Sequence, residues 1–501
     1  TGPRMNRILR LLLVLLPCVS AFGQAGKPIA SVDSVAALVA RSTIPDERVI
    51  MTGWRTNGDF GAHRILRHVP DSATSTNLGC VFASARNGRY FADDCDGGEL
   101  NVQWFGAVPD GSTDSTAAFQ SAITVAKAKR ASIRVPGGAG AYLVTSVSSP
   151  ALTLDASGLR LVGDGRDVLQ AVKPTVIEDV STNTLLQLGD GATDLQGIVI
   201  ENLTLKNSNS TANSIGILLS SNLSYCSFRG IGVYGFGAGV KIGYSWGHKF
   251  IEPSITAGVI GMLVEGPAVH VNVIAPTISY QSQAGVWLTN SAAGFPYSMQ
   301  FIGGTISHTP YAVMADGGPR AIVFRGQHWE DIGTGVEAGI VLKDYSYRMV
   351  FEDGLFVSPR TNIFQIAGDY HRFARNTTLT ALPDGCVMYN IESGAQFTDV
   401  WQDSWPVQFN VGTGATVTFT NTAGGAANNG ITNTDFVLSS GGSGYSARTY
   451  VHAFHASGTG ARFRPTIVNG VVTALTVTNA GSGYTTAPTS FSFIDEGPWI
   501  A

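Results

Sequence analysis

One short pattern returns seven times between residues 198 and 366, and it constrains the fold more than any other feature of the sequence. Each copy has a bulky apolar residue, four residues of mostly polar or turn-forming type, and a second bulky apolar residue. The pairs are Ile200/Leu205, Phe228/Val233, Phe250/Ile255, Val273/Ile278, Phe301/Ile306, Phe324/Trp329 and Phe351/Phe356. Successive copies start 22 to 28 residues apart, so loops of variable length must connect them.

More apolar residues follow in most copies, usually beside a glycine: Val240/Ile242, Met262/Val264, Val286/Leu288, Val313 and Ile363. The segments are rich in Val, Ile, Phe and Gly and show no amphipathic helical stripe, which disfavours a helical solenoid. Short strands that cannot bury a core alone can do so when copies stack as turns of one coil. The sequence therefore predicts an all-β parallel β-helix, with adjacent turns about 4.8 Å apart.

Length and charge agree with such a coil. A solenoid grows along one axis, so 501 residues can form one long body with small end domains. Only 14% of the residues are charged and 60 are glycine, which is typical of a turn-dense β protein. The net charge of −4 provides no basic field for nucleic acid, so nucleic acid is not expected as a partner.

The first 25 residues have the order of a secretory signal peptide. Arg4, Arg7 and Arg10 precede an apolar run at residues 11–16, and small residues follow Pro17. The run is too short for a stable membrane span, so we expect export and an extracellular location. A buried apolar helix in an oligomer is the alternative interpretation.

Cysteine usage fits an exported protein. Cys80 and Cys95 flank a predicted hairpin at residues 81–91 and could form a disulfide. Cys226 lies in a repeat strand and is interpreted as a small buried residue. With Cys386 included, the spacing matches no metal site, and we predict neither a metal nor another cofactor.

The remaining segments divide the chain into regions. Residues 26–100 are interpreted as a small N-terminal β-rich domain, and residues 101–400 as the coil. A helix is predicted from about Ser115 to Lys129, with Asp114 as its N-cap. It would cap the coil.

Two further regions follow the coil. Residues 401–430 are interpreted as a β segment and a Gly/Asn-rich linker. Residues 431–501 form a predicted C-terminal β module in which Gly-Ser-Gly-Tyr occurs twice, ending at Tyr445 and Tyr484. We interpret these tyrosines as core residues of turns, and Asn469-Gly470 predicts a hairpin.

One stretch of the sequence is specific enough to indicate a family. It contains Trp104-Phe105-Gly106-Ala107, Asp110-Gly111, Thr113-Asp114, Ala117-Ala118-Phe119, Val135-Pro136-Gly137-Gly138 and Tyr142. This run resembles the opening of pectate-lyase-like right-handed β-helix proteins, a variant common in bacteriophage tailspikes and bacterial polysaccharide-degrading enzymes. With the repeats, the resemblance covers roughly residues 45–400. The shared motif carries no catalytic group, so Asp110 and Asp114 are interpreted as turn and cap residues.

Alignment of the copies selects one group of candidate catalytic residues. Tyr280, His308 and Asp331 each stand seven residues after the first apolar position, in three consecutive turns, and Glu330 precedes Asp331. Stacked in this way, a phenol, an imidazole and a carboxylate would form an acid/base group. We therefore predict catalytic roles for Asp331, His308 and Glu330. The alternative is an ordinary surface hydrogen bond, with Glu330 capping a turn.

Substrate-binding roles are predicted for Tyr280, Trp287, Tyr311 and Arg325, whose rings or charge could hold a sugar. Other charges in the aligned copies have different interpretations. The pairs Glu201/Arg229 and Arg325/Glu352 are predicted to be structural salt bridges. Glu252 and Asp353 share a column but lie four turns apart, about 19 Å, which is too far for a concerted pair.

The resemblance implies a homotrimeric, tailspike-like protein of a phage tail or baseplate that binds and depolymerises a bacterial surface polysaccharide. Cleavage could be hydrolytic or eliminative. A secreted, pectate-lyase-like bacterial enzyme is a second hypothesis, and the signal-like leader favours it. A non-enzymatic trimeric fibre or adhesin is a third, favoured by the scarcity of paired carboxylates and by the Gly-Ser-Gly-Tyr tail.

Overall fold

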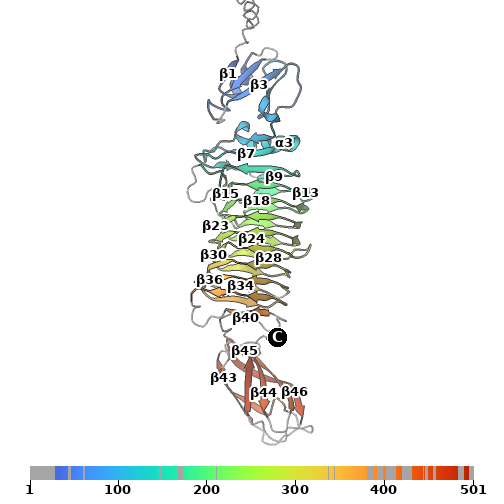
Figure 1. Ribbon diagram of the computed structural model, residues 1–501, viewed down its shortest axis with the longest axis vertical. Helices are drawn as coiled ribbons and strands as arrows, with labels where there is room; N and C mark the ends of the chain where they lie inside the picture. Colours follow the sequence, from blue (N-terminus) through green and yellow to red (C-terminus); the bar gives the residue numbers. More distant parts are fainter. Residues whose placement is uncertain are drawn as a thin grey trace, which may run out of the picture. The chain divides into compact units, whose positions relative to one another are not determined.

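The computed structural model describes residues 29–42, 47–59, 63–145, 149–166, 173–209, 212–336, 338–343, 345–380, 388–391, 399–401, 413–419, 431–443, 445, 449–454, 459–482 and 490–495 (Figure 1). The predicted leader, Cys386, the glycine-rich part of the linker at 424–430 and Tyr484 lie outside these residues. The chain divides into two compact units, Thr1–Val108 with Ala117–Arg134, and Pro109–Thr116 with Val135–Ala501.

The larger unit contains a coil of short parallel strands, which Figure 1 shows as a stack of turns. Each full turn contributes one strand to each of three long sheets. The first sheet contains β10 (Arg160–Gly163), β14 (Val199–Glu201), β18 (Ser227–Arg229), β22 (Lys249–Ile251), β26 (Asn272–Ile274), β29 (Gln300–Ile302), β32 (Val323–Arg325), β35 (Val350–Glu352), β38 (Arg372–Ala374) and β41 (Asp399–Trp401).

The second sheet contains β8 (Tyr142–Val144), β11 (Val176–Asp179), β15 (Thr204–Asn207), β19 (Gly232–Tyr234), β23 (Ser254–Thr256), β27 (Thr277–Ser279), β30 (Thr305–Thr309), β33 (His328–Ile332), β36 (Leu355–Val357) and β39 (Thr377–Thr378). The third contains β9 (Leu152–Leu154), β12 (Thr184–Leu188), β16 (Ile215–Leu219), β20 (Ala238–Ile242), β24 (Ile260–Glu265), β28 (Ala284–Thr289), β31 (Tyr311–Ala315), β34 (Ala338–Leu342), β37 (Asn362–Ile366) and β40 (Tyr389–Ile391). A short sheet joins β13 (Leu195–Gln196), β17 (Leu223–Ser224), β21 (Ser245–Trp246) and β25 (Ala268–Val269).

The register of these sheets confirms the predicted stacking of the sequence copies. The first apolar residues of all seven copies are direct partners in the first sheet, from Ile200 to Phe351. The second apolar residues, from Leu205 to Phe356, are partners in the second sheet. One alignment in the third sheet is wrong by one residue, because Phe364 and not Ile363 pairs with Ile340. Both candidates are buried and apolar, so composition could not separate them.

Aromatic rings fill the interior behind the first sheet. The rings of Phe301 and Phe324 are stacked with centroids 4.6 Å apart, and Phe324 stacks on Phe351 at 4.9 Å. All three side chains are almost fully buried. The spacing of parallel strands is close to the centroid distance of two stacked aromatic rings. One Phe in each turn therefore builds a continuous apolar column.

The corners of the coil use left-handed backbone. Between the second and third sheets the equivalent residues are Gly235, Ala257, Tyr280, His308, Asp331 and Ser358, all with φ between 48° and 76°. Such values are uncommon outside glycine, so the sharp bend is imposed by the stacked turns and not by local preference.

Two histidines occur in an otherwise apolar interior column, directly before strands of the first sheet. His248 accepts the N–H of Cys226 at Nδ1 (3.3 Å), and His371 accepts that of Met349 (3.1 Å). Burial lowers the pKa of each histidine to about 4. Both are therefore neutral hydrogen-bond acceptors of the coil at neutral pH.

The smaller unit has a five-stranded sheet in the order β1-β2-β3-β5-β4. Its elements are β1 (Ala30–Val32), α2 (Val35–Ala40), β2 (Arg48–Met51), β3 (Arg64–Val69), β4 (Val81–Ala83), β5 (Arg89–Ala92), η2 (Asp93–Asp96), β6 (Glu99–Asn101), η3 (Val102–Phe105), most of α3 (Thr116–Lys129) and β7 (Ser132–Val135). Helix α3 confirms the predicted helix, and the Asp114 carboxylate accepts the Thr116 N–H (2.9 Å). The short helix α2, capped by Ser34, was not predicted.

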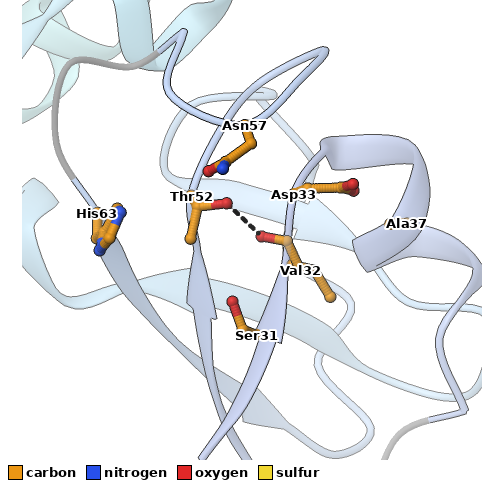
Figure 2. A pocket seen from close by; sticks show the side chains of 7 residues that line it. All are labelled: Ser31, Val32, Asp33, Ala37, Thr52, Asn57 and His63. Carbon is orange, nitrogen blue, oxygen red and sulfur yellow. Dashed lines mark hydrogen bonds between the residues drawn. The ribbon is translucent and has the colours of Figure 1, made fainter.

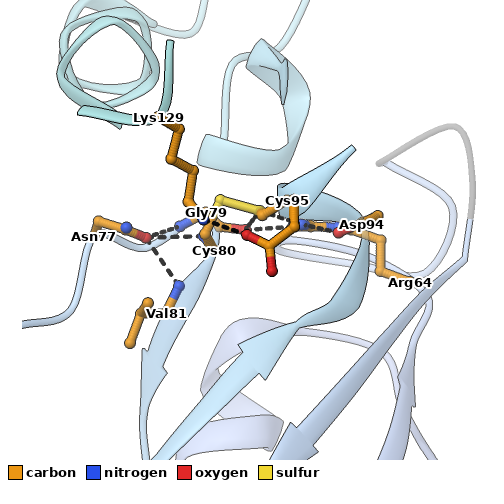
Figure 3. The surroundings of a disulfide bond; sticks show 9 residues. Arg64, Asn77, Gly79, Cys80, Val81, Asp94, Cys95 and Lys129 are labelled. Carbon is orange, nitrogen blue, oxygen red and sulfur yellow. Dashed lines mark hydrogen bonds and ion pairs between the residues drawn. A yellow bond between two sulfur atoms is a disulfide. The ribbon is translucent and has the colours of Figure 1, made fainter. Parts of the chain in front are cut away.

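The predicted disulfide is present between Cys80 and Cys95, with Cα atoms 5.7 Å apart (Figure 3). Beside it Arg64 is buried and donates to Asp94 and to the Gly79 carbonyl. The Arg64 guanidinium also lies 4.3 Å from the centre of the Trp104 ring. The family-like Trp104 therefore packs on the charged cluster that surrounds the disulfide.

A structural reason explains why residue 106 of the same motif is glycine. Its φ is 97°, and a Cβ there would lie 2.6 Å from the Trp54 indole. Only glycine permits both this backbone conformation and the close approach of the indole ring.

The C-terminal residues form antiparallel strands. Strand β42 (Thr413–Phe419) pairs with β43 (Phe436–Ser443), and a four-stranded sheet orders β46 (Val471–Ser482), β45 (Thr459–Val468), β44 (Thr449–Phe454) and β47 (Ser490–Asp495). Asn469 and Gly470, both with positive φ, form the predicted hairpin turn. Tyr445 is buried, as predicted, and its hydroxyl accepts the N–H of Ala415 (2.9 Å). Among the described residues, no helix combines the length and apolar character needed to cross a bilayer.

Replacing Phe324 by Ala should destabilise the coil by about 3 to 5 kcal/mol, because it leaves a cavity between two stacked rings. Urea unfolding would measure this loss. Ile302→Ala is the matched control, since Ile302 is 37% exposed in an adjacent strand. Equal stabilities of the two variants would contradict the stacked interior.

The buried histidines predict a pH dependence. Their pKa is about 4 in the folded protein and near 6.5 when unfolded, so the unfolded chain binds more protons between these values. Stability should be complete above pH 6.5 and fall as the pH approaches 4, by on the order of 3 kcal/mol per histidine. The double variant His248→Asn/His371→Asn, whose amides can accept the same N–H groups, should lose most of this dependence in thermal melts. An unchanged pH profile would refute the assignment.

Candidate functional site

The predicted catalytic column lies at the corner between the second and third sheets. Tyr280, His308 and Asp331 follow the equivalent positions Ser279, Ser307 and Glu330 of three consecutive second-sheet strands. The Tyr280 and His308 rings are stacked at 4.5 Å with an interplanar angle of 21°. His308 Nε2 lies 3.9 Å from Asp331 Oδ2. The three side chains that the aligned copies grouped are therefore adjacent in space.

Arg360 joins this corner from the following turn. Its Nε donates a hydrogen bond to Asp331 Oδ1, and this bond raises the pKa of the Arg360 guanidinium. Asp331 thus has a cation on one side and an imidazole on the other. An ion-paired carboxylate is better suited to orient His308 than to donate a proton itself.

Glu330 and His328 add polar groups on the adjacent face of the second sheet. Trp329 between them is buried in the interior, so strand alternation places His328 and Glu330 on the outer face. Nε2 of His328 and Nδ1 of His308 are buried atoms that have no hydrogen-bond partner among the described residues, and the same is true of Nε2 of the interior His248.

The predicted substrate-binding residues are distributed over the coil. Tyr280 is in the column and 61% exposed, and Tyr311 begins the third-sheet strand that follows His308. Trp287 lies on the third sheet and donates from Nε1 to Asp316 (3.2 Å). Arg325 lies on the first sheet, where it pairs with Glu352 (3.0 Å). The structure therefore does not bring Arg325 to the His308 corner.

The Arg325–Glu352 pair belongs to a second charged cluster. Arg375 donates to Glu352 (3.2 Å) and to Asp353 (2.6 Å), and its hydrogen bond lowers the pKa of Asp353. Both carboxylates are neutralised by arginine, which confirms the predicted structural salt bridge.

The predicted Glu201–Arg229 pair is wrong. Glu201 pairs instead with Arg160 (3.0 Å), two residues diagonally across the adjacent strand. Arginine is long enough for such a diagonal contact, and Arg160 precedes the aligned copies.

The N-terminal unit has a hollow of about 530 Å³. It is lined by Ser31, Val32, Asp33, Ala37, Thr52, Asn57 and His63 (Figure 2). Thr52 donates to the Val32 carbonyl across it (3.2 Å). Asp33 is the single carboxylate of the lining, so the hollow lacks the carboxyl pair that glycoside hydrolysis uses. Across the residues that the structure describes, no three His, Cys, Asp or Glu side chains converge as metal ligands.

Comparison with known proteins identifies proteins with a similar fold. Residues 100–211 match the family "Rhamnogalacturonase A/epimerase, pectate lyase-like". The tailspike of Acinetobacter baumannii phage AM24 has a TM-score of 0.56 and 12% identity, covering 94% of this chain and 84% of its own. The enzymatically active domain of bacteriophage CBA120 tailspike protein 2 has a TM-score of 0.55 and 11% identity, covering 96% and 82%. The chain therefore has a parallel β-helix fold that is similar to the fold of these phage tailspikes.

A third solved structure, ORF18 of Geobacillus virus E2, has a TM-score of 0.50 and 17% identity and covers 93% of this β-helix protein and 89% of its own chain. None of the curated proteins matches the sequence. At these identities the likeness is one of fold, so the roles of the corner residues depend on their own geometry.

Sequence reasoning missed Arg360 and His328 in this β-helix protein. Arg360 lies two residues beyond Ser358, the next member of the His308 column, so extending the column by one turn would have found it. His328 gave a weaker signal, because its position in the second sheet is occupied by threonine and leucine in the adjacent turns.

If the corner serves chemistry and not stability, its ion pair should contribute little to folding. Asp331→Asn, Arg360→Ala and the double variant should each unfold within about 2 °C of wild type, because exposed pairs are weak. Glu352→Ala is the contrast: it removes a buried carboxylate held by two arginines and should lower the midpoint much further. Differential scanning calorimetry measures all four. A large loss on removing Asp331 would make the corner structural.

Proposed function

We propose that this protein binds and cleaves a bacterial surface polysaccharide, as a depolymerase of the tailspike type. The observation that carries the proposal is the stack of Tyr280, His308 and Asp331 on one corner of the coil. A long, ridged wall suits an extended glycan, and the acid/base group lies on that wall. Two of the structurally similar proteins are named as tailspikes, and one of these is described as an enzymatically active domain.

The proposed roles follow from the contacts. His308 transfers the proton, and Asp331, held by Arg360, orients its imidazole. Glu330 is the second acid/base group. It is the carboxylate beside His308 for which the structure shows no ion pair among the described residues. Tyr280 stacks on His308 and offers an exposed ring to a sugar.

By similarity to tailspikes, we propose a homotrimer attached to a virion tail and acting outside the cell. One observation favours the alternative of a secreted bacterial enzyme: the Cys80–Cys95 disulfide, since structural disulfides persist in oxidising compartments. Mass spectrometry of the mature N-terminus and sedimentation in solution separate the two. A processed monomer supports the secreted enzyme, and an unprocessed trimer supports the tailspike.

Activity should be measured on surface polysaccharides extracted from a panel of bacterial hosts. New reducing ends report either type of cleavage, and a rise in ultraviolet absorbance from an unsaturated product reports elimination alone. Binding without cleavage on every polysaccharide that is bound would favour the non-enzymatic fibre.

On a cleaved polysaccharide, His308→Ala should reduce turnover by about 10²- to 10⁴-fold, the usual contribution of acid–base catalysis. Asp331→Asn should also impair turnover, while circular dichroism shows an intact coil. His270→Ala is the matched control, because His270 is an exposed histidine with φ 55° at another corner. Wild-type rates in both corner variants would remove this site from the proposal.

A further inference from the structure

A second surface of the coil lies at the corner between the third sheet and the first. Here Tyr297, Arg320, Tyr347 and Asp369 are direct backbone partners in four consecutive turns. The N–H of Arg320 donates to the Pro296 carbonyl (3.0 Å), and that of Tyr347 to the Pro319 carbonyl (2.9 Å). The backbone of this column is therefore as regular as that of a sheet.

Rings and guanidinium groups alternate along this column. The Arg320 guanidinium lies 4.3 Å from the centre of the Phe295 ring and 5.9 Å from that of Tyr347. Arg348 lies 5.1 Å from the Tyr347 ring, and Tyr370 meets Tyr347 edge to face at 5.1 Å. These cation–π and edge-to-face contacts hold long side chains in fixed positions.

We call the set of Phe295, Tyr297, Arg320, Tyr347, Arg348 and Tyr370 the aromatic edge. Tyr297 and Tyr370 are each 42% exposed, and both arginines are exposed. Among the described residues, no carboxylate pairs with Arg320 or Arg348. The edge thus presents two unpaired cations between aromatic rings to solvent.

We propose that the aromatic edge binds an acidic polysaccharide chain along the coil axis. This proposal rests on the proposed function in one respect only, the choice of a polysaccharide as the ligand. Sugar rings would pack on Tyr297, Tyr347 and Tyr370, and guanidinium groups would pair with carboxylates of the chain.

Two observations favour an acidic glycan as the ligand of this edge. Adjacent turns repeat at about 4.8 Å, close to the length of one sugar unit in an extended chain. The protein has a net charge of −4, so the unpaired arginines favour an anionic ligand of higher charge density.

The edge is separate from the His308 corner. Within each turn the third sheet lies between the two corners, so one glycan segment does not follow both columns. In Figure 1 the second-sheet strands β15, β23 and β30 lie on one side of the coil, and β13, which begins the short sheet of the other corner, lies on the opposite side. The edge would hold one segment of the polysaccharide while another segment of the same polysaccharide lies at the His308 corner for cleavage.

Affinity electrophoresis of the full chain tests the proposal with two probes that share a backbone, polygalacturonate and its fully methyl-esterified form. We expect polygalacturonate to retard the wild type and the neutral ester to do so at least tenfold less. Arg320→Ala and Tyr347→Ala should each weaken polygalacturonate binding at least tenfold. Arg229→Ala and Tyr234→Ala are matched controls, because both residues are exposed elsewhere on the coil, and they should bind as wild type.

Other outcomes overturn the proposal. Equal retardation by both probes would show that charge is not recognised, and wild-type binding by Arg320→Ala would remove the edge. If sedimentation shows that Arg320→Ala or Tyr347→Ala dissociates an oligomer, the edge is a subunit interface. His308→Ala should keep full binding, and Arg320→Ala should keep turnover of short fragments, so failure of the edge is distinct from failure of the catalytic site.

Discussion

The hydrogen bonds between parallel strands of successive turns are the constraint on which the coil depends. They hold each turn one strand spacing from the turn before it. Residues at equivalent positions of successive turns therefore stack in one column. Apolar columns become interior files such as Phe301, Phe324 and Phe351, and polar columns become lines on the surface. Polar side chains on this coil are therefore arranged along lines that follow the stack of turns.

The same constraint brings Tyr280, His308 and Asp331 together at one corner. A corner residue is held in the left-handed region by the ladders on both sides, as Tyr280, His308 and Asp331 are. The left-handed conformation bends the chain away from the sheet. The side chain of a corner residue therefore contacts the equivalent corner residue of the next turn. Stacking of Tyr280 on His308, and the approach of His308 to Asp331, follow from corner geometry with no further loop structure.

Much of this was predictable because the coil turns sequence spacing into spatial distance. The seven apolar pairs, the disulfide, helix α3 and the His308 column all depend on local patterns or on one repeated step. Contacts between columns were harder to predict. Arg160 reaches Glu201 diagonally, because long side chains choose partners by rotamer and not by register. Arg360, which pairs with Asp331, would have been found by extending the His308 column by one turn. Arg325 was misplaced for a different reason: it is close to Asp331 in the sequence, but β32 belongs to the first sheet and β33 to the second.

The carboxylates on this coil differ in the partners that surround them. Glu352 and Asp353 pair with arginines of adjacent turns, and these ion pairs connect the turns. Asp331 instead has one arginine and the His308 imidazole as neighbours. This mixed environment, and not the ion pair alone, is the basis of the acid/base role that we propose for the corner.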